Sequence, residues 1–194
     1  MSQLKGKNKR EQIIFEAARL FREKGFKTTS MRDIAKKVNV EAASLYSHIK
    51  SKDEILEELV FLIAYKFENG MKDIDNSSYS PYQKVQELIA LQIRLTVENP
   101  YAIFLQEQAL WHLKEPKKSS YQAIRTKYAA DFLRIIKEGI ELGEIKNQHP
   151  EIMLNTILSA SRWLYSWYTK DKKISPVELK IQILELLENG FNPK

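Results

Sequence analysis

The chain has 194 residues, of which 43% are hydrophobic, 29% are charged and none is cysteine. Such a length and composition suit a globular protein with a buried core, and the lack of cysteine excludes disulfides, thiolate metal sites and cysteine nucleophiles. The net charge of +6 is unevenly placed: Met1 to Lys52 carry 13 Lys and Arg against 5 Asp and Glu, and the remaining residues carry 18 against 20.

This basic N-terminal segment on an otherwise near-neutral chain predicts contact with the phosphates of a nucleic acid. The opening MSQLKGKNKR leads into charge-dotted sequence rather than an apolar run, so we expect no signal peptide. No stretch reaches the roughly 18 apolar residues that a membrane-spanning helix needs. We therefore expect a cytoplasmic protein without a membrane anchor.

Apolar residues recur three and four apart along almost the whole chain, which predicts an all-α fold of about nine helices. The first helix is expected over Lys9–Lys24, with an apolar face and an end at Gly25. That face holds Ile13, Ala17, Leu20 and Phe21. Two short helices are expected next, over Ser30–Lys37 and Glu41–His48.

The turn between these two short helices is only about three residues long, which requires a sharp crossing of a kind seen in helix-turn-helix motifs. Ser30 can cap the first helix, Ala35 is small at the crossing, and Asn39 tolerates the left-handed backbone of the turn. The shared apolar core is predicted to consist of Ile34, Val38, Val40, Leu45 and Ile49.

Longer helices are expected in the remainder of the chain. One begins after Ser51, where Ser51 to Glu54 fit a capping box, with Ile55, Leu56, Leu59, Leu62 and Ile63 as its buried stripe. The following helices are expected over Pro81–Glu98, around Phe104, Leu105 and Trp111, over Tyr121 to Ile140, from Glu151 to Lys170, and from Pro176 onward.

The second short helix would be the probe that enters the major groove, because its outer face is small and polar. Ala42 or Ala43 can contact a thymine methyl, and Ser44, Tyr46, Ser47, His48 and Lys52 can bond phosphates or base edges. The start of the preceding helix, where phosphates bind readily, adds Thr28, Thr29 and Arg32.

The stretch from Lys9 to Leu56 resembles the DNA-binding domain of the tetracycline-repressor (TetR) family. The matching residues are Gly25-Phe26, Thr28-Thr29, Arg32-Asp33-Ile34-Ala35, Val40, Ser44-Leu45-Tyr46 and Lys50-Ser51-Lys52-Asp53-Glu54-Ile55-Leu56. The chain departs from the family pattern at Asn39, Glu41 and Ile49. Glu41 would repel phosphates, so it either reads a cytosine amino group or points aside.

The resemblance implies two domains: a helix-turn-helix DNA-binding domain at 1–51 and a helical ligand-binding and dimerisation domain at 52–194. It also implies a homodimer through the last two helices, on a near-palindromic double-stranded operator, acting as a repressor. Both of those helices are apolar on several faces, as a shared interface requires, although a fully enclosed central helix pair would show the same pattern.

A cavity for a small effector is implied by the same resemblance. The candidate lining residues are Phe104, Gln108, Trp111, Tyr128, Phe132, Asn155, Ser159 and Trp163. This aromatic supply favours an apolar effector. Gly139 to Glu144, Trp163, Trp167-Tyr168 and Ile174-Ser175-Pro176 loosely resemble family members that respond to fatty acids or acyl-CoA thioesters.

The residues also bear on two other functions. An enzyme is disfavoured, because no catalytic constellation, cofactor motif or metal-ligand spacing is visible; His48, His112 and His149 fall on separate predicted elements. We therefore expect no catalytic residue, metal or cofactor. The other alternative keeps the DNA-binding domain but has the C-terminal domain contact a protein partner instead of a small ligand.

Overall fold

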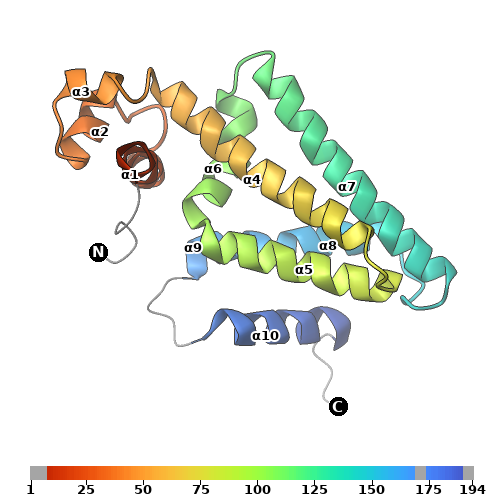
Figure 1. The fold of residues 1–194 in the computed structure, drawn as a ribbon. Coiled ribbons are helices and arrows are strands. Elements are labelled where there is room, and N and C mark those ends of the chain that lie inside the picture. Colours follow the sequence, from red (N-terminus) through yellow and green to blue (C-terminus); the bar gives the residue numbers. More distant parts are fainter. Residues whose placement is uncertain (1–7, 169–173, 190–194) are drawn as a thin grey trace. The chain divides into compact units, whose positions relative to one another are not determined.

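The computed structural model describes residues 8–168 and 174–189, except the side chains of residues 161 and 162. Regular structure in these ranges is helical throughout (Figure 1), which confirms the all-α prediction. The helices are α1 (Lys9–Lys24), α2 (Met31–Lys37), α3 (Ala42–Tyr46), α4 (Lys52–Asp75), α5 (Pro81–Glu98), α6 (Pro100–His112), α7 (Lys117–Glu141), α8 (Pro150–Arg162), α9 (Leu164–Trp167) and α10 (Pro176–Asn189).

These helices form two compact units. Among the described residues, one unit contains those up to Ile63 together with Tyr101–Ser120, and the other contains Ala64–Pro100 and those from Tyr121 onward. Helix α4 therefore passes from the first unit into the second, and nearly all of α6 belongs to the same unit as α1, α2 and α3. The domain boundary expected between residues 51 and 52 stays a prediction.

The N-terminal head, which we define as α1, α2, α3 and the first turn of α4, follows from local sequence. The predicted face of α1 is buried, and the helix ends at Gly25, whose φ of 90° suits glycine. Helix α2 begins with a capping box: the Ser30 hydroxyl accepts a bond from the Asp33 N–H (3.1 Å), and the Asp33 carboxylate accepts one from the Ser30 N–H (2.9 Å).

Helix α4 starts as its sequence predicts. The Ser51 hydroxyl accepts a bond from the Glu54 N–H at 3.1 Å. The Glu54 carboxylate reaches one residue further back than a capping box requires and accepts the Lys50 N–H at 2.8 Å. The predicted buried stripe is correct at Ile63 but wrong at Leu62, which is 50% exposed, whereas Val60, which was not predicted, is fully buried.

In the second unit, α5 is the central helix. It packs against α8, α9 and α10, and Figure 1 shows α10 running alongside it. Leu88, Ile89 and Ile93 are among its buried residues. At the end of α4, the guanidinium of Arg134 on α7 and the ammonium of Lys84 both pair with Asp75. The hydrogen bond from Arg134 lowers the pKa of that carboxyl.

The single helix expected from Glu151 to Lys170 is a wrong prediction. Helix α8 ends at Arg162, and α9 starts only after Trp163. The Ser166 hydroxyl donates to the Trp163 carbonyl at 2.8 Å, and such a local side-chain bond competes with the regular helical ladder. Tyr168 then turns to an extended backbone. The last two residues of the expected helix, at positions 169 and 170, lie outside the described residues.

The turn between α2 and α3 contains one strained residue. Asn39 has a φ of 54°, the left-handed conformation that its place in the turn predicted. We expect Asn39→Ala to lower the free energy of unfolding by about 1 kcal/mol, because alanine lacks the polar side chain that eases this conformation. Urea denaturation would measure this loss against Lys36→Ala on the exposed face of α2 as the control. Equal stability of both variants would contradict strain at this turn.

Candidate nucleic-acid interface and effector site

The helix-turn-helix core consists of residues from both of its helices. Ile34 and Ala35 of α2, Leu45 of α3 and Ile49 are buried, as predicted, whereas Val38 and Val40 are only half-buried at the turn. The Val40 N–H donates to the Ala35 carbonyl at 3.0 Å, which closes the turn. Helix α3 is therefore held against α2 along one side only.

The other side of α3 faces away from this core. Of its five residues only Leu45 is buried, and Tyr46 is 53% exposed. Glu41 is the N-cap residue but its side chain makes no cap bond. The exposed residues on or directly after α3 that were predicted to face DNA are Ala42, Ala43, Ser44, Tyr46, Ser47 and His48. A surface of such small side chains allows close approach of the backbone to a groove.

Near the start of α2, two of the three residues that were expected to contact DNA are exposed and the third is buried. Thr28 and Arg32 are exposed, and Arg32 makes no ion pair with any described residue. Thr29 is only 1% exposed, and its hydroxyl donates to the Gly25 carbonyl at 2.8 Å. Thr29 is therefore too deeply buried to contact DNA as expected. The sequence alone did not distinguish the buried Thr29 from its exposed neighbour Thr28.

Lys52 is also placed differently from the expectation that it bonds DNA. Its ammonium donates to three backbone carbonyls, of Phe26 at 2.8 Å, of Thr29 at 2.9 Å and of Lys27 at 3.0 Å. It also lies 4.8 Å from the centroid of the Phe26 ring. The sequence pointed to this residue, but the charge alone did not distinguish a phosphate from the carbonyls of a loop.

Phe26 is the residue of this region that the sequence reasoning did not single out as functional. Its ring packs edge-on against Phe21 at 5.0 Å and lies 4.8 Å from the ring of His112, at the end of α6. Burial lowers the pKa of His112, and the charges of Lys27 and Lys52 lower it further, so a neutral ring meets Phe26. The one sequence feature that could have pointed to Phe26 is the Gly25-Phe26 pair, which belongs to the residues that carry the family resemblance.

The predicted effector residues do not gather at one described cavity. Trp111 is 85% exposed, Trp163 is 44% exposed, and Asn155 and Ser159 are exposed on α8. These four side chains therefore do not line an enclosed interior in the described chain. Phe104 and Gln108 are half-buried on α6, in the first unit.

Tyr128 and Phe132 do lie inside the second unit. The Tyr128 ring packs edge-on against Phe67 of α4 (5.6 Å) and Phe132 of α7 (6.3 Å). Its hydroxyl accepts a bond from the Gln92 amide at 2.9 Å. Burial raises the pKa of this hydroxyl, so it is neutral. The aromatic group thus has an uncharged polar edge, which the sequence reasoning missed because Gln92 belongs to another helix.

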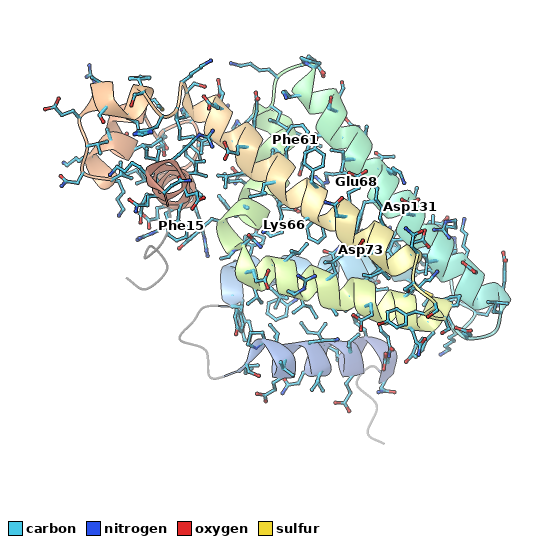
Figure 2. All side chains as sticks on the ribbon, in the orientation of Figure 1. Phe15, Phe61, Lys66, Glu68, Asp73 and Asp131 are labelled. Carbon is cyan, nitrogen blue, oxygen red and sulfur yellow. The ribbon has the colours of Figure 1, made fainter. Side chains whose placement is uncertain are left out.

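A surface groove of about 600 Å³ lies elsewhere in the same unit, and none of the predicted effector residues lines it. It is bordered by the second half of α4, by α5 and by the start of α10, and Figure 2 labels Asp73 on its α4 side. Gly70, Ala90 and Leu91 are among its lining residues. Lys180 of α10 pairs with Glu87 of α5 across it at 3.7 Å.

The last long helices expose many apolar side chains. Ile152 of α8 and Val177, Ile181 and Leu186 of α10 are between 44% and 68% exposed. Single exposed apolar residues are ordinary, but several on two helices suggest a surface that another chain covers. Among the described residues, none of the helices is long and apolar enough to cross a membrane. No grouping of three potential metal-binding side chains occurs in the same ranges.

Comparison with known proteins gives consistent matches over nearly the whole chain. Residues 13–59 match the model for bacterial regulatory proteins of the tetR family, and residues 78–191 match that for the tetracyclin repressor-like C-terminal domain. The transcriptional repressor KstR2 of Mycobacterium tuberculosis is 23% identical over 187 residues, covering 95% of this chain and 93% of KstR2.

Solved structures show the same fold. The structure of the ketosteroid transcriptional regulator KstR2 of M. tuberculosis has a TM-score of 0.87 at 21% identity, covering 96% of each chain. A Clostridium perfringens putative fatty acid metabolism regulator has a TM-score of 0.72 at 24% identity, covering 94% of this chain and all of the other. These similarities account for the helix order and the N-terminal helix-turn-helix.

Proposed function

This chain belongs to the TetR family of bacterial transcription regulators, and from that premise we propose that it is a cytoplasmic repressor that a small apolar molecule releases from a near-palindromic operator. The DNA-binding part rests on the surface formed by α3 and the two residues after it. Of the seven residues from Ala42 to His48, six are exposed and Leu45 alone is buried. The excess of positive charge in the same part of the chain attracts the DNA backbone.

We assign the DNA contacts to the exposed residues of the head. Arg32, near the start of α2, and Thr28 before it are the proposed phosphate contacts, and the residues of α3 are the proposed base and groove contacts. Thr29 and Lys52 are left out of this surface, since one is buried and the other bonds backbone carbonyls.

Tyr46 offers a direct test of this surface. We expect Tyr46→Ala to weaken binding to the DNA upstream of its own gene by about tenfold, since a half-exposed hot-spot side chain at an interface contributes on the order of 1 to 2 kcal/mol. The melting temperature should barely change, because the side chain is 53% exposed. Fluorescence anisotropy would measure the affinity, with Tyr79→Ala, on a 49% exposed tyrosine of the second unit, as the control. Unchanged affinity of the Tyr46 variant would remove α3 from the contact surface.

The second element of the proposal is a homodimer through the last two long helices, α8 and α10. Their exposed apolar side chains supply the surface, and a two-fold axis pairs each helix with its own copy. The dimer presents two copies of α3 to successive faces of the major groove, about 34 to 36 Å apart on B-DNA.

The effector part of the proposal concerns a mostly apolar molecule, with fatty acids and acyl-CoA thioesters among its candidates. Tyr128, Phe132 and Gln92 support it, because they form an aromatic group with a neutral polar edge. The names of two similar proteins, a ketosteroid regulator and a putative fatty acid metabolism regulator, support the same chemical class. The effector acts only by binding one conformation of the dimer more tightly than the other.

Native mass spectrometry of protein purified from its own cells tests the effector directly. A retained small molecule would give its mass and the stoichiometry per dimer in one measurement. A bare dimer from cells grown on lipid substrates would argue against the apolar effector and in favour of a protein partner for the second unit.

A further inference from the structure

The ammonium group of Lys52 is fully occupied by the loop between α1 and α2. A lysine has three N–H donors and no acceptor, and here three carbonyls, of Phe26, Lys27 and Thr29, lie within 3.0 Å of it. The carbonyls of a loop that has no regular ladder need such donors. A phosphate could bond this ammonium only if the loop gave up at least one of its three bonds.

We propose that Lys52 is a positioning residue of the DNA-binding head, which fixes the loop 26–29 so that Thr28 and Arg32 face DNA, and that the end of α6 braces the same loop through His112. The inference rests on the DNA-contact surface proposed above. Lys52 then supports DNA binding by holding the loop 26–29 in place and not by bonding a phosphate itself.

Phe26 connects the two parts of this brace. The Lys52 ammonium lies 4.8 Å from the centroid of its ring, and the His112 ring lies 4.8 Å away at an interplanar angle of 40°. Next to these contacts, Lys114 forms an ion pair with Asp53, the neighbour of Lys52, at 3.0 Å. The end of α6 therefore contacts the loop, and Lys114, two residues after α6, contacts the start of α4.

The start of α6 contacts the head as well. The Tyr101 ring packs edge-on against Phe15 of α1 at 5.7 Å, and the Arg22 guanidinium lies 5.6 Å from the same ring (Phe15 is labelled in Figure 2). Both ends of α6 thus contact the head within one compact unit. Phe26 is the residue through which the end of α6 contacts the loop 26–29.

The salt dependence of DNA binding separates positioning from phosphate contact. A DNA duplex selected by the wild-type protein from a random library serves as the probe. Arg32→Ala should reduce the slope of log K against log salt by about 1 for each head, as the loss of a phosphate contact does. We expect Lys52→Met to bind about tenfold more weakly and, when added to Arg32→Ala, to leave the slope unchanged, because Lys52 then has no charged phosphate contact left to position.

The Lys52→Arg variant distinguishes a phosphate contact of residue 52 from its bonds to the loop carbonyls. Arginine keeps the charge, so it would preserve binding at a phosphate, but its planar fork cannot direct three donors at three converging carbonyls. We therefore expect Lys52→Arg to bind as weakly as Lys52→Met. Wild-type affinity of Lys52→Arg would overturn the inference, and so would a further loss of slope when Lys52→Met is added to Arg32→Ala. An unchanged slope for Arg32→Ala would instead refute only the proposed contact of Arg32.

Hydrogen exchange of backbone amides in the protein without DNA tests the same proposal even if a variant no longer binds DNA. We expect the Thr29 amide, which donates to the Gly25 carbonyl at 3.2 Å, to exchange faster in both Lys52 variants, with the amides of α5 unchanged. His112→Ala should accelerate the same amide, and His112→Phe, which keeps a ring against Phe26, should not. Wild-type exchange in Lys52→Met and His112→Ala would contradict the brace.

Discussion

Ile181→Glu is expected to turn the dimer into a monomer of 22.7 kDa and to weaken operator binding by about a hundredfold or more. Ile181 lies on α10 and is 57% exposed, so more than half of its side chain is not covered by the described residues of its own chain. In the proposed interface it is buried, and a carboxylate without a partner is strongly unfavourable in such a place. Two linked heads bind far more tightly than one, which explains the large effect on DNA.

Light scattering coupled to gel filtration measures the mass, and anisotropy measures the affinity. Leu142→Glu is the matched control, because Leu142 is 63% exposed but follows α7 and lies outside the last two helices. The control should stay dimeric and bind as the wild type does. A dimeric Ile181→Glu variant, or a monomeric Leu142→Glu variant, would place the interface elsewhere.

Leu45→Ala is expected to lower the free energy of unfolding by about 3 kcal/mol and to abolish specific DNA binding. Leu45 is fully buried and is the buried residue of α3, a helix of five residues. So short a helix is not stable by itself and depends on packing. Removing the side chain leaves a cavity under the surface that we propose for the major groove.

Leu62→Ala provides the same chemical change at a side chain that is 50% exposed. It should lower the free energy of unfolding by less than about 1 kcal/mol and leave DNA binding unchanged. Urea denaturation followed by circular dichroism measures both losses. Similar losses in the two variants would mean that α3 does not depend on Leu45 for its place.

Helix limits were the part of this protein most accessible from its sequence. Lys9–Lys24 and Pro81–Glu98 were predicted to the residue, since glycine ends the first and a proline preceded by Ser80 begins the second. Ser30 and Ser51 also cap the helices as expected. Each of these features depends on residues a few positions apart, so the chain determines them locally.

The sequence was a poorer guide to which side chains are buried and which are exposed. Leu62 and Trp111 were expected inside but are exposed, and Thr29 was expected on the surface but is buried. Helical period alone shows that a residue is on an apolar face, but which neighbours cover that face depends on the other helices. The hydrogen bond between Gln92 and Tyr128 joins two helices, so no local pattern indicated it.

The sequence by itself determined the all-helical class, the helix-turn-helix and the strained turn at Asn39, because capping, periodicity and backbone preference act over a few residues. The family followed separately, from the resemblance of the stretch Lys9 to Leu56. Only the tertiary structure decided the role of Lys52. A lysine at the start of α4 suits a phosphate as well as a loop, and the three carbonyls that bind it come from residues more than twenty positions earlier in the chain.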